Sequence, residues 1–120
     1  MLGEPTAKQL VEATAGFLEK VAIPQLEGHA AFHARVAANV LAIVARELEL
    51  GPAAADAEAE RLAQLLGGDG PLDAQRRDLC ARLTKGEMTL ETPGLADHLL
   101  ATAIDRVRIE QPNYGSFKRL

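Results

Sequence analysis

The stretch from about His29 to Leu50 constrains the fold more than any other part of the sequence. Its large apolar side chains recur at spacings of three and four residues and cover about half of the helical wheel. Alanines fill much of the remainder, and their small size lets neighbouring helices approach closely. A helix that is apolar over most of its circumference is typical of a buried helix. We therefore predict a long buried central helix over about 29–50, which Gly51-Pro52 should end.

The rest of the chain predicts four further helices, separated by glycine and proline. Each shows apolar residues at helical spacing, and the first opens with Thr6-Ala7-Lys8-Gln9, which has the form of a capping box. Strands are not predicted, since alternating β-branched or aromatic runs are absent and aromatic residues make up only 3% of the chain. The predicted fold is all-α, a compact bundle of about five helices. The four further segments are Thr6 to Pro24, Ala53 to Leu66, Leu72 to Lys85, and Thr92-Pro93 to Pro112.

The length of 120 residues fits a single helical domain over 1–120, with 111–120 as a C-terminal tail. The net charge of −4 argues against nucleic acid as a partner, because phosphate binding needs a basic surface. No apolar run approaches the roughly 18 residues that span a bilayer, so no membrane association is expected. The single cysteine, Cys80, excludes an internal disulfide, and no signal peptide is recognisable. A soluble, cytoplasmic protein is the resulting expectation.

Two charged residues fall on faces that otherwise read as apolar. Glu47 lies within the apolar arc of the central helix. Arg76 lies between Leu72 and Leu83 on the apolar face of the predicted helix from Leu72 to Lys85. A buried lone carboxylate is costly, so it should be paired or have a raised pKa. We predict that Glu47 and Arg76 form a buried ion pair. The alternative is that Glu47 acts as a general acid or base in a pocket.

A polar stripe formed by Arg35, Asn39 and Arg46 runs along one side of the central helix. Such a stripe is a candidate ligand or interaction surface, suited to an anionic ligand such as a phosphate or a CoA moiety. The simpler interpretation is a hydrated face or a hydrogen-bonded contact between helices.

The sequence does not assemble a catalytic or metal-binding set. His29 and His33 are spaced by one helical turn, but two ligands do not hold a zinc ion, and His98 is distant in sequence. Cys80 reads as a small core residue. Ser116 lacks the surroundings of a nucleophile elbow. We predict no catalytic residue, no metal and no cofactor, and the balance favours a protein that is not an enzyme.

The run from Phe32 to Leu48 resembles the signature of an uncharacterised bacterial helical domain. Further similarity lies in Pro5–Leu10, Leu83–Glu87 and Pro112-Asn113-Tyr114. In that family the C-terminal motif usually reads Asn-Pro-x-Tyr, and Gln111 stands here in place of the asparagine. The family domain occurs beside, or fused to, aminoglycoside-phosphotransferase-like kinases associated with acyl-CoA dehydrogenases. The resemblance implies a setting in acyl-CoA metabolism and no particular mechanism.

Two functions follow as hypotheses. The first is a non-catalytic helical accessory or interaction module that binds a kinase-like or acyl-CoA-dehydrogenase-like partner, or forms a homo-oligomer. The second is a small-molecule binding protein or enzyme that takes an acyl-CoA or phosphorylated ligand at the region of Arg35, Asn39, Arg46 and Glu47.

Overall fold

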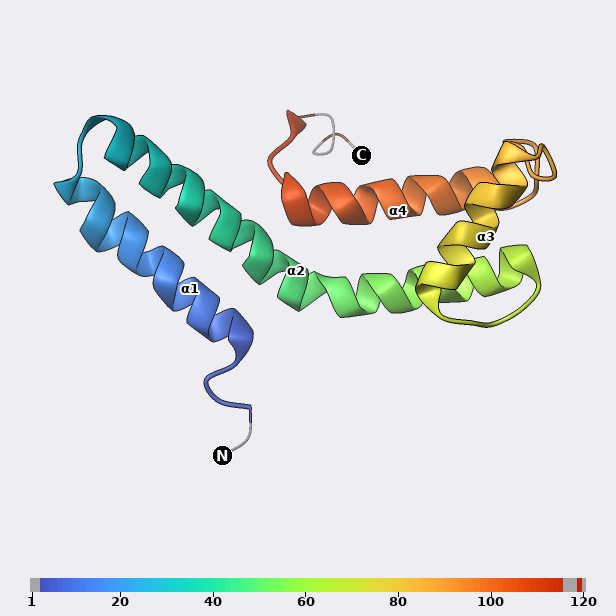
Figure 1. The fold of residues 1–120 in the computed structure, drawn as a ribbon, viewed down its shortest axis with the longest axis horizontal. Coiled ribbons are helices and arrows are strands. Elements are labelled where there is room, and N and C mark those ends of the chain that lie inside the picture. The colour runs from blue at the N-terminus through green and yellow to red at the C-terminus, as the bar shows by residue number, and fades with distance from the viewer. Residues whose placement is uncertain (1–2, 116–118, 120) are drawn as a thin grey trace. The chain divides into compact units, whose positions relative to one another are not determined.

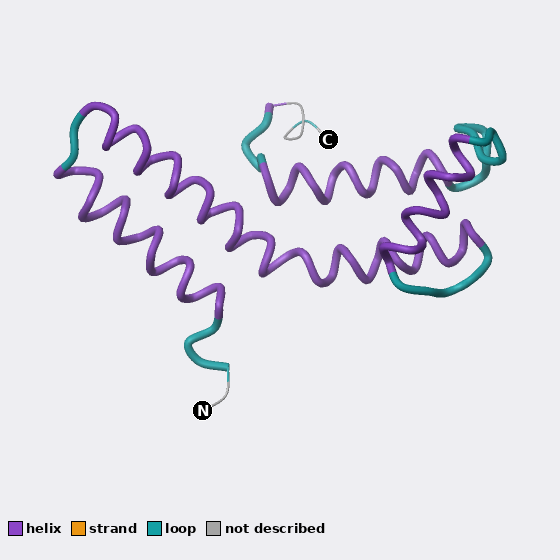
Figure 2. The backbone as a smooth tube through the Cα atoms, viewed as in Figure 1, coloured by secondary structure: helices purple, strands orange, loops and turns teal. Residues whose placement is uncertain are grey.

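The computed structural model describes residues 3–115 and 119 (Figures 1 and 2). This part of the chain is helical throughout and contains no strand, which confirms the predicted all-α class with a long central helix. None of its helices is both long and apolar enough to cross a bilayer. The chain divides into two compact units, Met1–Gly51 and Pro52–Leu120, and α2 contributes residues to both. The α-helices are α1 (Ala7–Phe17), α2 (Gly28–Leu66), α3 (Leu72–Thr84) and α4 (Leu95–Glu110).

The described residues form four α-helices, so the prediction of five was wrong. The second and third predicted helices are one, because α2 runs for 39 residues through Gly51-Pro52. A proline in a helix lacks the N–H donor, and its ring crowds the carbonyl four residues back as well as the N–H and Cβ of the preceding residue. Gly51 has no Cβ, which removes one part of this crowding. A Cβ at Gly51 would also lie 2.5 Å from Oε2 of Glu47. Glycine before the proline therefore lets the helix continue where the sequence rule predicts a stop.

The N-terminal unit is a hairpin of α1 and the first half of α2, which lie side by side and antiparallel in Figure 1. The predicted capping box is confirmed: Gln9 N donates to Thr6 Oγ1 at 3.1 Å, and Thr6 N donates to Gln9 Oε1 at 2.8 Å. A π-helical turn over Leu18–Ala22 and a 3-10 turn over Ile23–Gln25 follow α1. The chain then reverses into α2. An ion pair between Lys8 Nζ and Glu49 Oε2, at 3.8 Å, joins the start of α1 to α2.

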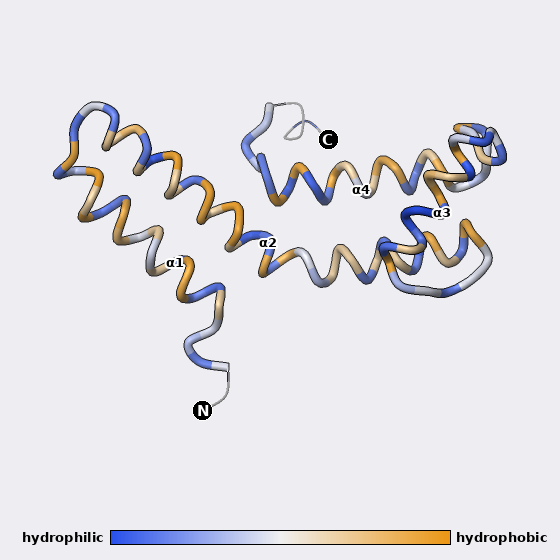
Figure 3. The backbone as a smooth tube through the Cα atoms, viewed as in Figure 1, coloured by the Kyte–Doolittle hydropathy of each residue, from blue (hydrophilic) through white to orange (hydrophobic). Residues whose placement is uncertain are grey.

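The buried residues of the hairpin are alanines, and many of its large apolar side chains are exposed to solvent. Ala31, Ala38 and Ala45, seven residues apart, are its only buried residues among those described. Five large apolar side chains of α2, each four residues after the last, are between 38 and 58% exposed: Phe32, Val36, Val40, Val44 and Leu48. We call these five residues the α2 ridge. Figure 3 shows hydrophobic stretches alternating with hydrophilic ones along both helices of this unit. The prediction that this helix is buried is therefore wrong over the ridge.

The C-terminal unit holds the core of large side chains. The end of α2 packs with α3 and α4 around Leu62, Leu79, Met88 and Leu95, of which Leu62 and Leu95 are fully buried. Three partly buried leucines surround this core: Leu65, Leu66 and Leu72.

The last helix begins later than its sequence suggests. The predicted segment starts at Thr92-Pro93, but α4 starts at Leu95 with Gly94 at the N-cap position. The Thr92 hydroxyl instead accepts a hydrogen bond from Thr89 N at 2.9 Å, within the preceding loop. Gly94 has a φ of +86°, and a Cβ there would touch Leu65, so the tight approach of this loop to α2 favours glycine. Helix α4 ends at Glu110. Of the predicted tail, residues 116–118 and 120 lie outside the described residues.

Candidate functional site

A cluster of polar side chains joins the three helices of the C-terminal unit. Glu58 and Arg61 lie one turn apart on α2, Arg76 lies on α3, and His98 and Thr102 lie one turn apart on α4. We call these five residues the His98 cluster. Glu58 and His98 are buried, with 9 and 3% of their surface exposed. Buried polar groups of this kind are stable only when they are hydrogen-bonded, so the geometry of the cluster decides what it can do.

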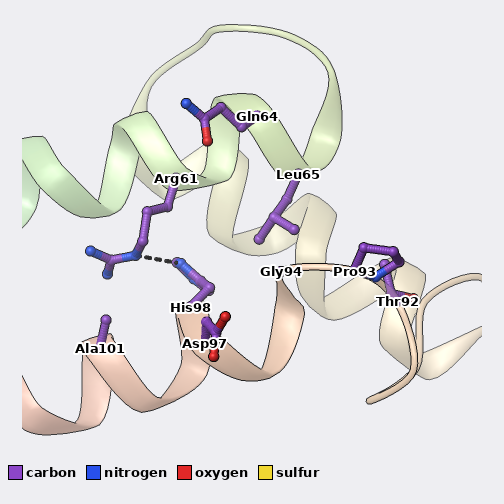
Figure 4. Close-up of a pocket in the computed structure, with 9 residues that line it drawn as sticks. All are labelled: Arg61, Gln64, Leu65, Thr92, Pro93, Gly94, Asp97, His98 and Ala101. Atoms are coloured by element: carbon purple, nitrogen blue, oxygen red, sulfur yellow. Dashed lines mark hydrogen bonds between the residues drawn. The ribbon is translucent and has the colours of Figure 1, made fainter.

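Arg61 holds the α4 side of the cluster. Its Nε donates to Nδ1 of His98 at 3.0 Å (Figure 4), and its Nη2 donates to Oγ1 of Thr102 at 3.1 Å. An arginine cannot accept a hydrogen bond, so Nδ1 of His98 is the unprotonated nitrogen. The neutral imidazole then carries its proton on Nε2. In the part of the chain that the structure describes, no carboxylate forms an ion pair with Arg61 and no group accepts from Nε2 of His98.

The surroundings of His98 favour the neutral ring. Burial lowers the pKa of His98, the positive charge of Arg61 lowers it further, and Glu58 acts in the opposite direction. The net shift is downward from the ordinary value of 6.5. His98 is therefore a neutral donor at neutral pH, poised beside a guanidinium that is paired only with neutral acceptors.

Glu58 and Arg76 form the other half of the cluster. Nε and Nη2 of Arg76 each donate to one carboxylate oxygen of Glu58, both at 2.7 Å, in a two-pronged ion pair. The hydrogen bond from Arg76 lowers the pKa of Glu58 against the opposing effect of burial, and the same bond raises the pKa of Arg76. The predicted pair of Glu47 and Arg76 does not form, because Arg76 binds Glu58 instead. Glu58 lies with α3 in the C-terminal unit, whereas Glu47 lies in the N-terminal unit.

A cavity of about 480 Å³ opens between α2 and α4 beside Arg61 and His98 (Figure 4). Its remaining polar lining comes from Gln64, Thr92 and Asp97. Its apolar lining comes from Leu65, Pro93 and Ala101 together with the backbone of Gly94. The size falls within the range of small-molecule pockets, and a mostly apolar wall with a few polar groups is also typical of them.

The residues proposed from sequence lie elsewhere, in the N-terminal unit. Arg46 lines a groove of about 330 Å³ between α1 and α2, together with Lys8, Glu12 and Glu49. Arg35 and Asn39 are exposed on the same helix. Glu47 is half-buried, with its carboxylate against Gly51. Whether this region takes a ligand stays a prediction.

Sequence reasoning missed Glu58, Arg61 and the role of His98. His98 was considered only as a metal ligand and set aside as distant from the other histidines. The apolar stripe of its helix pointed to the wrong face, because Leu99 and Leu100 are exposed while α4 buries Leu95, His98 and Ile109. In the described part of the chain, no group of three or more His, Cys, Asp or Glu side chains is placed to hold a metal ion.

These features define an all-helical domain whose C-terminal unit contains a hydrogen-bonded polar cluster. The chain belongs to the family described as Domain of unknown function (DUF6285), whose model matches residues 24–114. This confirms the resemblance to an uncharacterised domain. No curated protein and no solved structure matches the chain.

Replacing His98 should make the free energy of unfolding fall less steeply as the pH drops below about 7.5. The folded pKa of His98 lies below its ordinary value of 6.5, so between the two the unfolded chain binds more protons. The free energy of unfolding of the wild type should therefore fall as the pH drops from about 7.5 through the unfolded value toward the folded one. His98→Gln keeps an acceptor for Arg61 and should flatten this slope. Urea denaturation across the range measures it.

The matched control is His29→Gln, which alters an exposed histidine at the start of α2. It should retain the wild-type slope. A His98→Gln variant with the wild-type slope would show that His98 does not titrate differently in the folded chain.

Proposed function

We propose that this domain is a non-catalytic helical interaction module that associates with a second copy of itself through the α2 ridge. The supporting observation is that the ridge is exposed along its whole length, although its residues are of the kind that normally form a core. Fully burying one such side chain stabilises a protein by roughly 1.5–3 kcal/mol, and these are about half-buried, so covering all five offers a substantial gain.

The N-terminal unit has little to hold it together without such a cover. Its buried residues are alanines, which remove little apolar area from water on folding. A two-helix hairpin of this kind is marginal alone, because most helical stability in proteins comes from packing an apolar face. Of the exposed apolar side chains of this unit, which include Leu10 and Phe17 of α1, those of the ridge form the continuous row on α2.

The arrangement of the ridge favours a second copy as the occupant. Val36 and Val44 lie four residues on either side of Val40, and Phe32 and Leu48 lie eight residues on either side. When two such helices cross antiparallel on a twofold axis at Val40, each large apolar side chain faces another. Rows of residues four apart also form the ridges that interdigitate in the commonest class of helix packing.

Val40→Glu should abolish this association. The substitution places two carboxylates against each other at the twofold axis, where they lose water and repel. We expect the dimer dissociation constant to rise by about 100-fold or more. Analytical ultracentrifugation of the full chain over a concentration series measures it. The control is Leu90→Glu, which adds the same charge at another exposed apolar residue, 73% exposed and outside the ridge.

A monomeric wild type at all concentrations would overturn self-association. The family resemblance supplies the other partner class, a kinase-like or acyl-CoA-dehydrogenase-like protein. If the chain is monomeric and binds a purified protein of that class through Val40, the ridge serves that partner and the second copy is wrong. A monomer strongly destabilised by Val40→Glu would show that the ridge is covered within the chain, which also contradicts the proposal.

A further inference from the structure

We propose that the cavity beside Arg61 and His98 binds the carboxylate of a small organic monoanion with an apolar body. This site is independent of the α2 ridge and lies wholly within the C-terminal unit.

The charge of Arg61 is the first reason. Its guanidinium is part-buried and donates to two neutral acceptors, Nδ1 of His98 and Oγ1 of Thr102. Among the described residues it has no ion-pair partner, and the nearby carboxylate of Glu58 is occupied by both prongs of Arg76. Partly buried charges in proteins are normally paired, so a cation without a carboxylate at the edge of a cavity suits an anionic ligand.

The state of His98 is the second reason. The hydrogen bond from Arg61 fixes the tautomer, so the ring offers Nε2–H as a donor with no acceptor among the described residues. His98 lines the cavity together with Arg61. A guanidinium and a neutral N–H donor bind a carboxylate with charge-assisted hydrogen bonds, and among the described residues no protein carboxylate is bonded to either group.

The remaining lining selects the kind of anion. Asp97 is exposed at the same cavity, so its charge opposes a second negative charge there. Beside Asp97 and the single positive charge of Arg61, a phosphate dianion adds two negative charges and a monocarboxylate adds only one, so the monocarboxylate meets less repulsion. Leu65, Pro93 and Ala101 supply an apolar wall, which suits a hydrocarbon or aromatic body attached to the carboxylate.

The test is an NMR titration of the full chain with benzoate, butyrate, inorganic phosphate and n-butylammonium, following the imidazole signals of His98. We expect saturable shifts with benzoate and butyrate, and tighter binding of benzoate than of butyrate because of its larger apolar body. Phosphate and butylammonium should bind at least about tenfold more weakly than benzoate, given the charges at the cavity.

Three variants assign the site. Arg61→Gln keeps a donor but removes the charge, and should weaken benzoate binding by about tenfold or more. Asp97→Asn changes an exposed residue and should strengthen it by about two- to fivefold, since it removes the opposing charge. Arg77→Gln, at an exposed residue of α3 that does not line the cavity, should leave it unchanged.

Several results would overturn the proposal. These are the absence of saturable binding by any carboxylate, tighter binding of phosphate than of benzoate, and an equal loss in Arg61→Gln and Arg77→Gln. If Arg61→Gln fails to fold, the Asp97→Asn variant still tests the proposal. Weaker or unchanged benzoate binding in that variant would contradict the claim that the charge of Asp97 opposes the ligand.

Discussion

Leu62→Ala should lower the free energy of unfolding by about 3 kcal/mol, within the roughly 2–5 kcal/mol typical of buried leucines. Leu62 is fully buried at the centre of the C-terminal unit, where it packs with Leu79, Met88 and Leu95. Truncation removes apolar contacts and leaves a cavity that three helices converging on one residue cannot readily fill. Urea denaturation followed by circular dichroism measures the change.

Leu90→Ala is the matched control, since it removes the same atoms from a leucine that is 73% exposed. It should cost less than about 0.5 kcal/mol. Leu62 also neighbours Arg61, so the variant should broaden the NMR signals of His98 as the contact between α2 and α4 loosens. A cost below about 1 kcal/mol for Leu62→Ala would show that the core can close around the missing side chain.

Local signals in this sequence predicted local structure well. The hydroxyl of Thr6 and the amide of Gln9 form the capping box that their spacing indicates, and Pro112 comes just after the end of α4. Such features depend on atoms within a few residues, which a short window of sequence contains. The same reasoning failed at Gly51-Pro52. There, the rule that a proline stops a helix omits the missing Cβ of the preceding glycine, and the helices on both sides are strong enough to join.

For the site, the sequence predicted the type of interaction but not the residues that form it. A carboxylate paired with Arg76 was expected, but Glu47 and Glu58 lie on the same face of α2, about three turns apart, so the choice depends on which part of α2 packs with α3. That contact is set by packing across some 18 residues of chain and cannot be deduced from either helix alone. The contact of Arg61 with His98, 37 residues apart, is a still longer-range consequence of the same packing. A wide apolar arc likewise predicts that a helix packs against another surface, but it does not identify that surface. The α2 ridge is such a case.

Arg76→Met should cost about 1–3 kcal/mol near neutral pH, and more than the complementary change Glu58→Gln. Methionine keeps much of the aliphatic stem but leaves the carboxylate of Glu58 charged, with only 12% of its side chain exposed. Removing Glu58 instead leaves the guanidinium of Arg76, which is 52% exposed and which water can hydrate, so solvent screens that loss. Glutamine also retains an oxygen that can accept from Arg76. Denaturation of both single variants and of the double variant gives the coupling between the two residues.

The pH dependence distinguishes a charge effect from a packing effect in Arg76→Met. In the wild type, Arg76 lowers the pKa of Glu58 below its ordinary value of 4.5, so the pair stabilises the fold above that value and loses this contribution as the pH falls toward the folded pKa. Burial raises the pKa of Glu58, and in Arg76→Met only the weaker effects of His98 and Arg61 oppose this rise. Glu58 should therefore take up a proton at a higher pH than in the wild type. Once Glu58 is protonated it no longer carries an unpaired buried charge, so the penalty should shrink between about pH 7 and pH 4. An equal penalty at both pH values would assign the loss to packing of the Arg76 stem and not to its charge.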